Sequence, residues 1–280
     1  MHDPVQDASA AQPDGLPATA AAARELLMDG NRRFVRLADA PDPPGARWHL
    51  VRLDAADLGD GRAAATPAHT PFAAVLGCSD ARVPIELIFN EGPNDLFVVR
   101  VAGNGLGMDV LGSVKYAVEN LGGTLKLIVV LGHSGCGALT TSVDLFLNPR
   151  EYLTIAAKHS IRNILDRSLL VVQASARKLV SVFGADVVHR YGYRQALIEA
   201  SIAANAALAA YSIGEEFVAN RSTGLLVAYG VYVIETREVW APRPGNTDGT
   251  GLSVVPRDPS GFGDIGDAIA TSARIASFLK

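Results

Sequence analysis

The sequence of 280 residues has few cysteines, little charge and no long apolar run. Two cysteines allow at most one disulfide, which excludes a small secreted scaffold held together by several disulfides. Charged residues make up 19% of the chain and its net charge is -4, so nothing indicates a nucleic-acid partner. No uninterrupted apolar run reaches the roughly 18 residues that cross a bilayer, and we expect no membrane partner. The N-terminal residues lack a basic segment followed by an apolar one, so we expect a cytoplasmic protein.

The distribution of apolar residues predicts one domain between two tails. Residues 1–19 are rich in Ala, Pro, Asp and Gln with almost no large apolar side chains, which predicts a disordered tail. Residues 20–240 are predicted to form a single domain that begins with a helix over 20–37 and a loop with a short helix over 48–69. Residues 241–280 are predicted to be an extension, whose last amphipathic segment, 267–279, docks as a helix or stays loose.

Short apolar strands alternate with helices through most of the domain. Strands are predicted over 72–77, 95–101, 126–131 and 223–233, and residues 235–239 either continue or pair with the last of them. Helices are predicted over 84–89, 112–121, 138–147, 153–165, 169–183 and 194–213. Continuous apolar strands between helices indicate an α/β fold with a mostly parallel sheet covered on both faces. The long helical stretch 140–217 is consistent with extra packing around the core or with contact between protomers.

Two of the predicted strands are followed by glycine and then by polar side chains, namely Cys78, Asp80, Arg82, His133 and Cys136. Ligands of parallel sheets bind outside the carboxyl ends of the strands, which is where both clusters fall. Thiolate, imidazole and carboxylate are the groups that tetrahedral zinc takes, and the two thiols disfavour magnesium and calcium. Simpler interpretations remain: buried cysteines that only pack, a single disulfide, or a salt bridge between an aspartate and an arginine.

The arginine determines which kind of zinc site this would be. Three protein ligands with an exchangeable fourth position are typical of a catalytic site, and a permanent fourth ligand makes the site structural. Arg82 competes with a metal for the Asp80 carboxylate, because a guanidinium can hold a carboxylate through two hydrogen bonds.

The two clusters, CSDARVP at 78–84 and HSGCG at 133–137, resemble the paired signature of the β-class carbonic anhydrases. Residues 30–34, 95–104, 112–118 and 230–232 resemble further blocks of that family. The resemblance implies zinc bound by Cys78, His133 and Cys136, with Asp80 and Arg82 as the catalytic pair. In resting members of the family, the aspartate is itself the fourth zinc ligand, so Asp80 also counts as a candidate metal ligand. The implied activity is that of a carbonate dehydratase, a zinc lyase in which zinc-bound hydroxide hydrates carbon dioxide reversibly to bicarbonate and a proton.

The resemblance also implies a substrate pocket, formed by His69, Phe97, Tyr116 and Gly137. In the family the phenylalanine and the tyrosine come from the neighbouring protomer, which implies a homodimer or a multiple of dimers. The chain departs from the family pattern in having His69 where many members have glutamine, Val75 where bicarbonate-inhibited members have tryptophan, and Ala81 for serine. Two alternatives stay open: a hydrolase of carbon disulfide or carbonyl sulfide on the same scaffold, and a non-catalytic binding protein stabilised by zinc.

Overall fold

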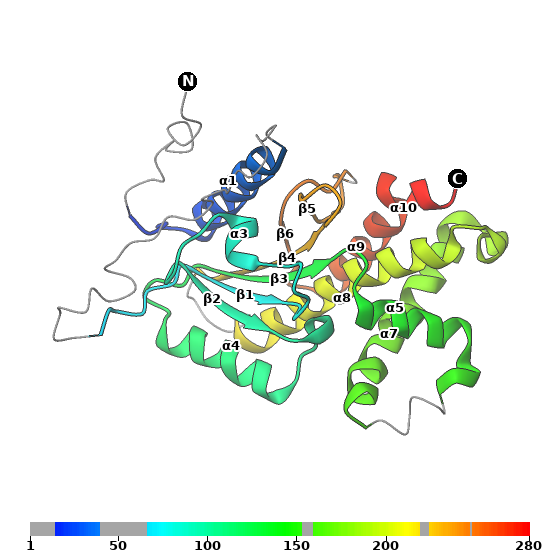
Figure 1. Ribbon diagram of the computed structural model, residues 1–280, viewed down its shortest axis with the longest axis horizontal. Coiled ribbons are helices and arrows are strands. Elements are labelled where there is room, and N and C mark those ends of the chain that lie inside the picture. The colour runs from blue at the N-terminus through cyan, green and yellow to red at the C-terminus, as the bar shows by residue number, and fades with distance from the viewer. Residues whose placement is uncertain (1–14, 40–65, 153–158, 219–223, 247) are drawn as a thin grey trace, which may run out of the picture.

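A central sheet organises the molecule (Figure 1). The computed structural model describes residues 15–39, 66–152, 159–218, 224–246 and 248–280. The strands are β1 (Ala73–Gly77), β2 (Leu96–Arg100), β3 (Leu127–His133), β4 (Leu226–Tyr232), β5 (Val239–Trp240) and β6 (Ser253–Val254). Their order is β2-β1-β3-β4-β5, with β6 also paired to β4; β1 to β4 run parallel, and β5 and β6 are antiparallel to β4. The predicted α/β fold is confirmed.

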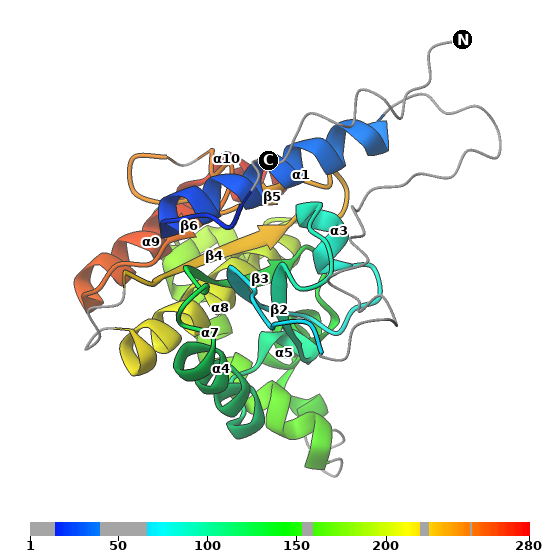
Figure 2. The ribbon, with the colours of Figure 1, turned by 90° about the vertical axis from the view of Figure 1, so that its left-hand side faces the viewer.

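The helices cover both faces of this sheet (Figure 2). They are α1 (Ala20–Asp39), α3 (Ile85–Phe89), α4 (Met108–Asn120), α5 (Gly137–Leu147), α7 (His159–Phe183), α8 (Tyr193–Phe217), α9 (Pro259–Thr271) and α10 (Ala273–Phe278). Alternate residues of each strand face opposite layers, so Val75 and Val129 pack with α1 and α3, whereas Leu76 and Val130 pack with the larger helical layer. Helix α8 is long and apolar enough to cross a membrane by length and composition, but 72% of its most apolar window is buried inside the protein.

The helical stretch differs from its prediction in one place. Two helices were expected over 153–165 and 169–183, whereas α7 runs without a break from His159 to Phe183. Residues 153–158 of the first prediction lie outside the described residues. The polar residues 166–168 caused the error: Asp166 and Arg167 are exposed, and the buried Ser168 hydroxyl donates to the Ile164 carbonyl within the same helix. Asp166 pairs with Arg162, and the Arg167 guanidinium donates to the carbonyl of Leu106. Helix α7 packs on α5, α8 and α9, so this stretch does pack around the core within one chain.

The last part of the chain is folded onto the domain. Strand β6 pairs with β4, and both α9 and α10 pack on α8. Residues 267–279 thus dock as the end of α9 and α10. At the other end, the predicted tail falls outside the described residues up to residue 14, as does the predicted loop over 48–69 up to residue 65.

Helix α1 lies unusually close to α3, and this contact depends on a glycine. A Cβ atom added to Gly30 would lie 1.6 Å from the carbonyl oxygen of Phe89. The next residue, the buried Asn31, donates from Nδ2 to the carbonyls of Ile88 and Arg237 and accepts from the amide of Val239. Gly30 therefore permits the approach that lets Asn31 join α1 to the sheet.

Gly30→Ala should destabilise the protein by about 1–3 kcal/mol, because the obstructing atom is backbone and the helices must separate. Gly112→Ala is the matched control: this glycine lies on the exposed side of α4, with nothing within 4 Å of an added Cβ. The control should stabilise the protein by up to ~1 kcal/mol through helix propensity. Urea unfolding of both variants measures the difference, and equal midpoints would contradict the close-contact explanation.

Candidate metal centre

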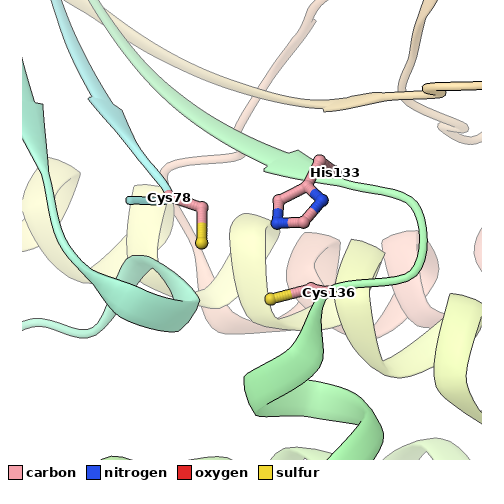
Figure 3. Close-up of side chains that lie close together, drawn as sticks. All are labelled: Cys78, His133 and Cys136. Atoms are coloured by element: carbon pink, nitrogen blue, oxygen red, sulfur yellow. The ribbon is translucent and has the colours of Figure 1, made fainter. Parts of the chain in front are cut away.

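The carboxyl ends of two neighbouring strands bring the predicted ligands together. Strands β1 and β3 pair in parallel with Gly77 opposite Leu131, so Cys78 follows one strand while His133 ends the other. Cys136 caps the N-terminus of α5 after a tight turn at Gly135, which has a φ of 62°. Figure 3 shows the imidazole lying close to both sulfurs. The structure leaves both thiols free, so the disulfide interpretation is wrong.

The three side chains have the geometry and the chemistry of a metal site. The ligand atoms of Cys78, His133 and Cys136 all lie within 4.8 Å of one another, and all three residues are buried. His133 Nδ1 lies 3.0 Å from the carbonyl oxygen of Ser134, which orients the ring. Its other nitrogen, Nε2, is buried and has no hydrogen-bond partner within the described part of the chain. A buried nitrogen without a partner beside two sulfurs fits a soft divalent cation such as zinc.

The two thiols shift each other's pKa in opposite directions. A hydrogen bond from Cys136 lowers the pKa of the Cys78 thiol to about 3 although burial opposes this. The same pairing, together with burial, raises the pKa of Cys136 above its ordinary range. Binding of a cation through both sulfurs must displace the protons that these thiols carry.

Asp80 lies beside the ligand set but is bonded to Arg82. The guanidinium donates from Nε to Oδ1 at 3.0 Å and from Nη2 to Oδ2 at 2.8 Å, and the Arg82 amide also donates to Oδ1. These bonds hold the pKa of Asp80 well below its usual range. Asp80 Oδ2 is 3.9 Å from His133 Nε2, but among the described residues the group of ligand atoms within 4.8 Å of one another comprises Cys78, His133 and Cys136 without Asp80.

Two residues to which the sequence analysis gave no role fix the backbone of this site. Arg100, at the end of β2, donates to the carbonyls of Cys78 and Asp80. The buried Asn104 donates to the carbonyl of Leu131 at 2.6 Å and thereby links the end of β3 to the loop after β2. The available signal was position, because Arg100 ends a third parallel strand at the same edge of the sheet.

The four predicted pocket residues do not lie together around the metal ligands within one chain. His69, Phe97 and Tyr116 form a row of rings, with centroid separations of 6.0 Å and 6.3 Å. Phe97 pairs with Ala74, four residues before Cys78, which places it about 13 Å back along the sheet from the ligand end. Gly137 starts α5 directly after Cys136, with open space around its α-carbon. Within one chain, the structure thus places Gly137 beside a ligand and the row of rings near the other end of β2.

The chain is similar to known proteins over the region that includes this site. A sequence model of the family described as carbonic anhydrase matches residues 73–239, more than half of the chain. The chain is 42% identical over 123 residues to a carbonic anhydrase of Mycolicibacterium smegmatis and 41% identical over 122 residues to carbonic anhydrase 2 of Mycobacterium tuberculosis. Each match covers 44% of this chain and 52% of the relative, so the chain spans about half the length of these curated relatives.

Among solved structures, the β-carbonic anhydrase CcaA is 24% identical, with a TM-score of 0.46 over 67% of this chain and 84% of that one. The family match includes both strand ends and every residue of the candidate metal centre. With this match and the Cys-His-Cys ligand set, the chain belongs to the carbonic anhydrase family, in the β-class that its motifs resemble.

Proposed function

We propose that the protein is a zinc-dependent carbonate dehydratase, which interconverts carbon dioxide and bicarbonate. The observation that carries the proposal is the buried ligand set with Asp80 held at its side by Arg82. A structural zinc site has four protein ligands, whereas here the fourth candidate is bonded elsewhere. The family membership of the chain supports the same reaction.

Cys78, His133 and Cys136 are the residues that would hold zinc. Bound there, the ion would supply an acidified water as nucleophile near neutral pH. The orientation of His133 suits this role, because the contact of Nδ1 with the Ser134 carbonyl leaves Nε2 free to act as a ligand.

Asp80 would orient the proton of the attacking water. An ionised carboxylate only accepts hydrogen bonds, so a water beside it must point a proton toward Oδ1 or Oδ2. Arg82 keeps the carboxylate ionised and directed, and Arg100 holds the backbone carbonyl of the same aspartate. The chain therefore fixes both the side chain and the main chain of this hydrogen-bond acceptor.

We propose further that the pocket is completed by a second copy of the chain. Within the described residues, β2 pairs only with β1, which leaves its other edge available. Phe97 on this strand is only partly buried and Tyr116 is 50% exposed, although both lie in the aromatic row. The row would then meet the ligand set of the partner chain, and His69 and Gly137 would border carbon dioxide there.

If a second chain completes the pocket, the active protein is a homodimer or a multiple of dimers. Sedimentation of the active enzyme should give at least twice the mass of one chain. Tyr116→Ala should lower the hydration rate without changing the zinc content, because Tyr116 is not a ligand. A fully active monomer would contradict this part of the proposal.

Arg82→Ala tests the catalytic pair. We expect zinc content to be unchanged and the hydration rate to fall roughly 10–100-fold, because Asp80 loses the group that directs it. Stopped-flow hydration of carbon dioxide measures the rate, and metal analysis measures the zinc.

Arg194→Ala is the matched control for this variant. Arg194 makes the same two-bond contact with Asp144, at 2.7 Å and 2.8 Å, and is similarly exposed. This control should keep the full rate. No hydration by the zinc-loaded wild type would overturn the proposed function, and release of sulfide from carbon disulfide or carbonyl sulfide would indicate the hydrolase instead.

A further inference from the structure

Two carboxylates accept hydrogen bonds from the turn between the candidate metal ligands His133 and Cys136. The Gly135 amide donates to Oε1 of Glu199 at 3.1 Å. The Ser134 hydroxyl donates to Oε2 of Glu235 at 2.9 Å and accepts a hydrogen bond from the amide of Ile234. Because the Ser134 carbonyl contacts His133 Nδ1, the position of this turn also sets the orientation of the histidine ring.

Glu199 is a buried acid in the apolar helix α8, with only 2% of its surface exposed. Oε1 also accepts a hydrogen bond from Gln195, at 3.2 Å. The charge is balanced on Oε2 by the Arg274 guanidinium, at 3.0 Å. A buried carboxylate without a cation is costly, so Arg274 stabilises the Glu199 carboxylate in its place beside the turn.

Arg274 itself is fixed in position by its surroundings. Its guanidinium lies 5.9 Å from the ring centre of Trp240 and 5.7 Å from that of Phe278, and 3.8 Å from Oε2 of Glu235. It therefore faces both carboxylates that hold the turn. Arg274 belongs to α10, well beyond residue 239, where the family match ends.

We propose that Arg274 is a positioning residue for the metal-ligand turn, acting through Glu199 and Glu235. The C-terminal extension thereby completes the support of the site. The inference rests on the proposed function, because it concerns the turn that would hold zinc. In this arrangement, loss of the guanidinium leaves Glu199 uncompensated, and the carboxylate shifts away from the Gly135 amide toward water.

The test compares Arg274→Met with Arg190→Met. Arg190 donates to the carbonyl of Leu279 and so also attaches the C-terminal end, but in the described part of the chain no hydrogen bond or ion pair joins it to Glu199. In the metal-free protein, hydrogen exchange at the Gly135 amide should be about tenfold faster in Arg274→Met and unchanged in Arg190→Met. In the zinc-loaded protein, release of zinc to a chelator should also be about tenfold faster in Arg274→Met only, at the lower end of the ~10–100-fold effects of residues behind metal ligands.

Two further variants separate charge balance from general docking of the helix. Arg274→Lys keeps a cation near Glu199, so amide exchange and zinc release should both be slower than in Arg274→Met and closer to the wild-type rates. This variant replaces Arg274→Met in the comparison if Arg274→Met does not fold. Arg274→Met combined with Glu199→Gln removes both charges and should recover slow exchange, because the amide oxygen of glutamine still accepts from Gly135.

The inference is overturned if the Gly135 amide of a folded Arg274→Met exchanges at the wild-type rate, or if it exchanges equally fast in Arg190→Met. It is also overturned if this amide exchanges as fast in the double variant as in Arg274→Met alone. A wild type that binds no zinc would instead contradict the proposed function. The exchange measurements on metal-free protein would still decide the role of Arg274.

Discussion

The site depends on one ion pair, that of Asp80 with Arg82. The two side chains are two residues apart and share two hydrogen bonds, so the carboxylate is fixed within a single loop. Without this pair, the carboxylate would lie next to three buried ligands that attract a cation, and it would be the natural fourth ligand. In the proposed function, the guanidinium would thus separate a site that is open for a substrate from one that is closed by a fourth protein ligand.

The pair can act in this way because the surrounding backbone is immobilised. Arg100 binds the carbonyls on both sides of Ser79, and Asn104 binds the end of β3. On the far side, Glu199 and Glu235 hold the turn before Cys136. Side chains that would not themselves contact a metal therefore hold both strand ends of the candidate metal centre through hydrogen bonds.

Much of this arrangement could be predicted from the sequence, because the local signals were strong. Apolar strands followed by glycine and reactive side chains placed Cys78, His133 and Cys136 at one edge of the sheet, and the structure brings them together. The supporting residues could not be found in this way. Arg100 is 22 residues from Cys78, Glu199 is 64 residues from Gly135, and Arg274 is 75 residues from Glu199. Contacts over such separations exist only once the sheet and α8 are assembled.

The central claim is that Arg82 keeps Asp80 off the metal in the working enzyme. A crystal structure of the zinc-loaded protein at about pH 8, where a zinc-bound water is largely ionised, tests it directly. The account predicts zinc bonded to Cys78, His133 and Cys136, with both hydrogen bonds between Asp80 and Arg82 intact. A carboxylate oxygen of Asp80 bonded to zinc, with the pair to Arg82 broken, would contradict it.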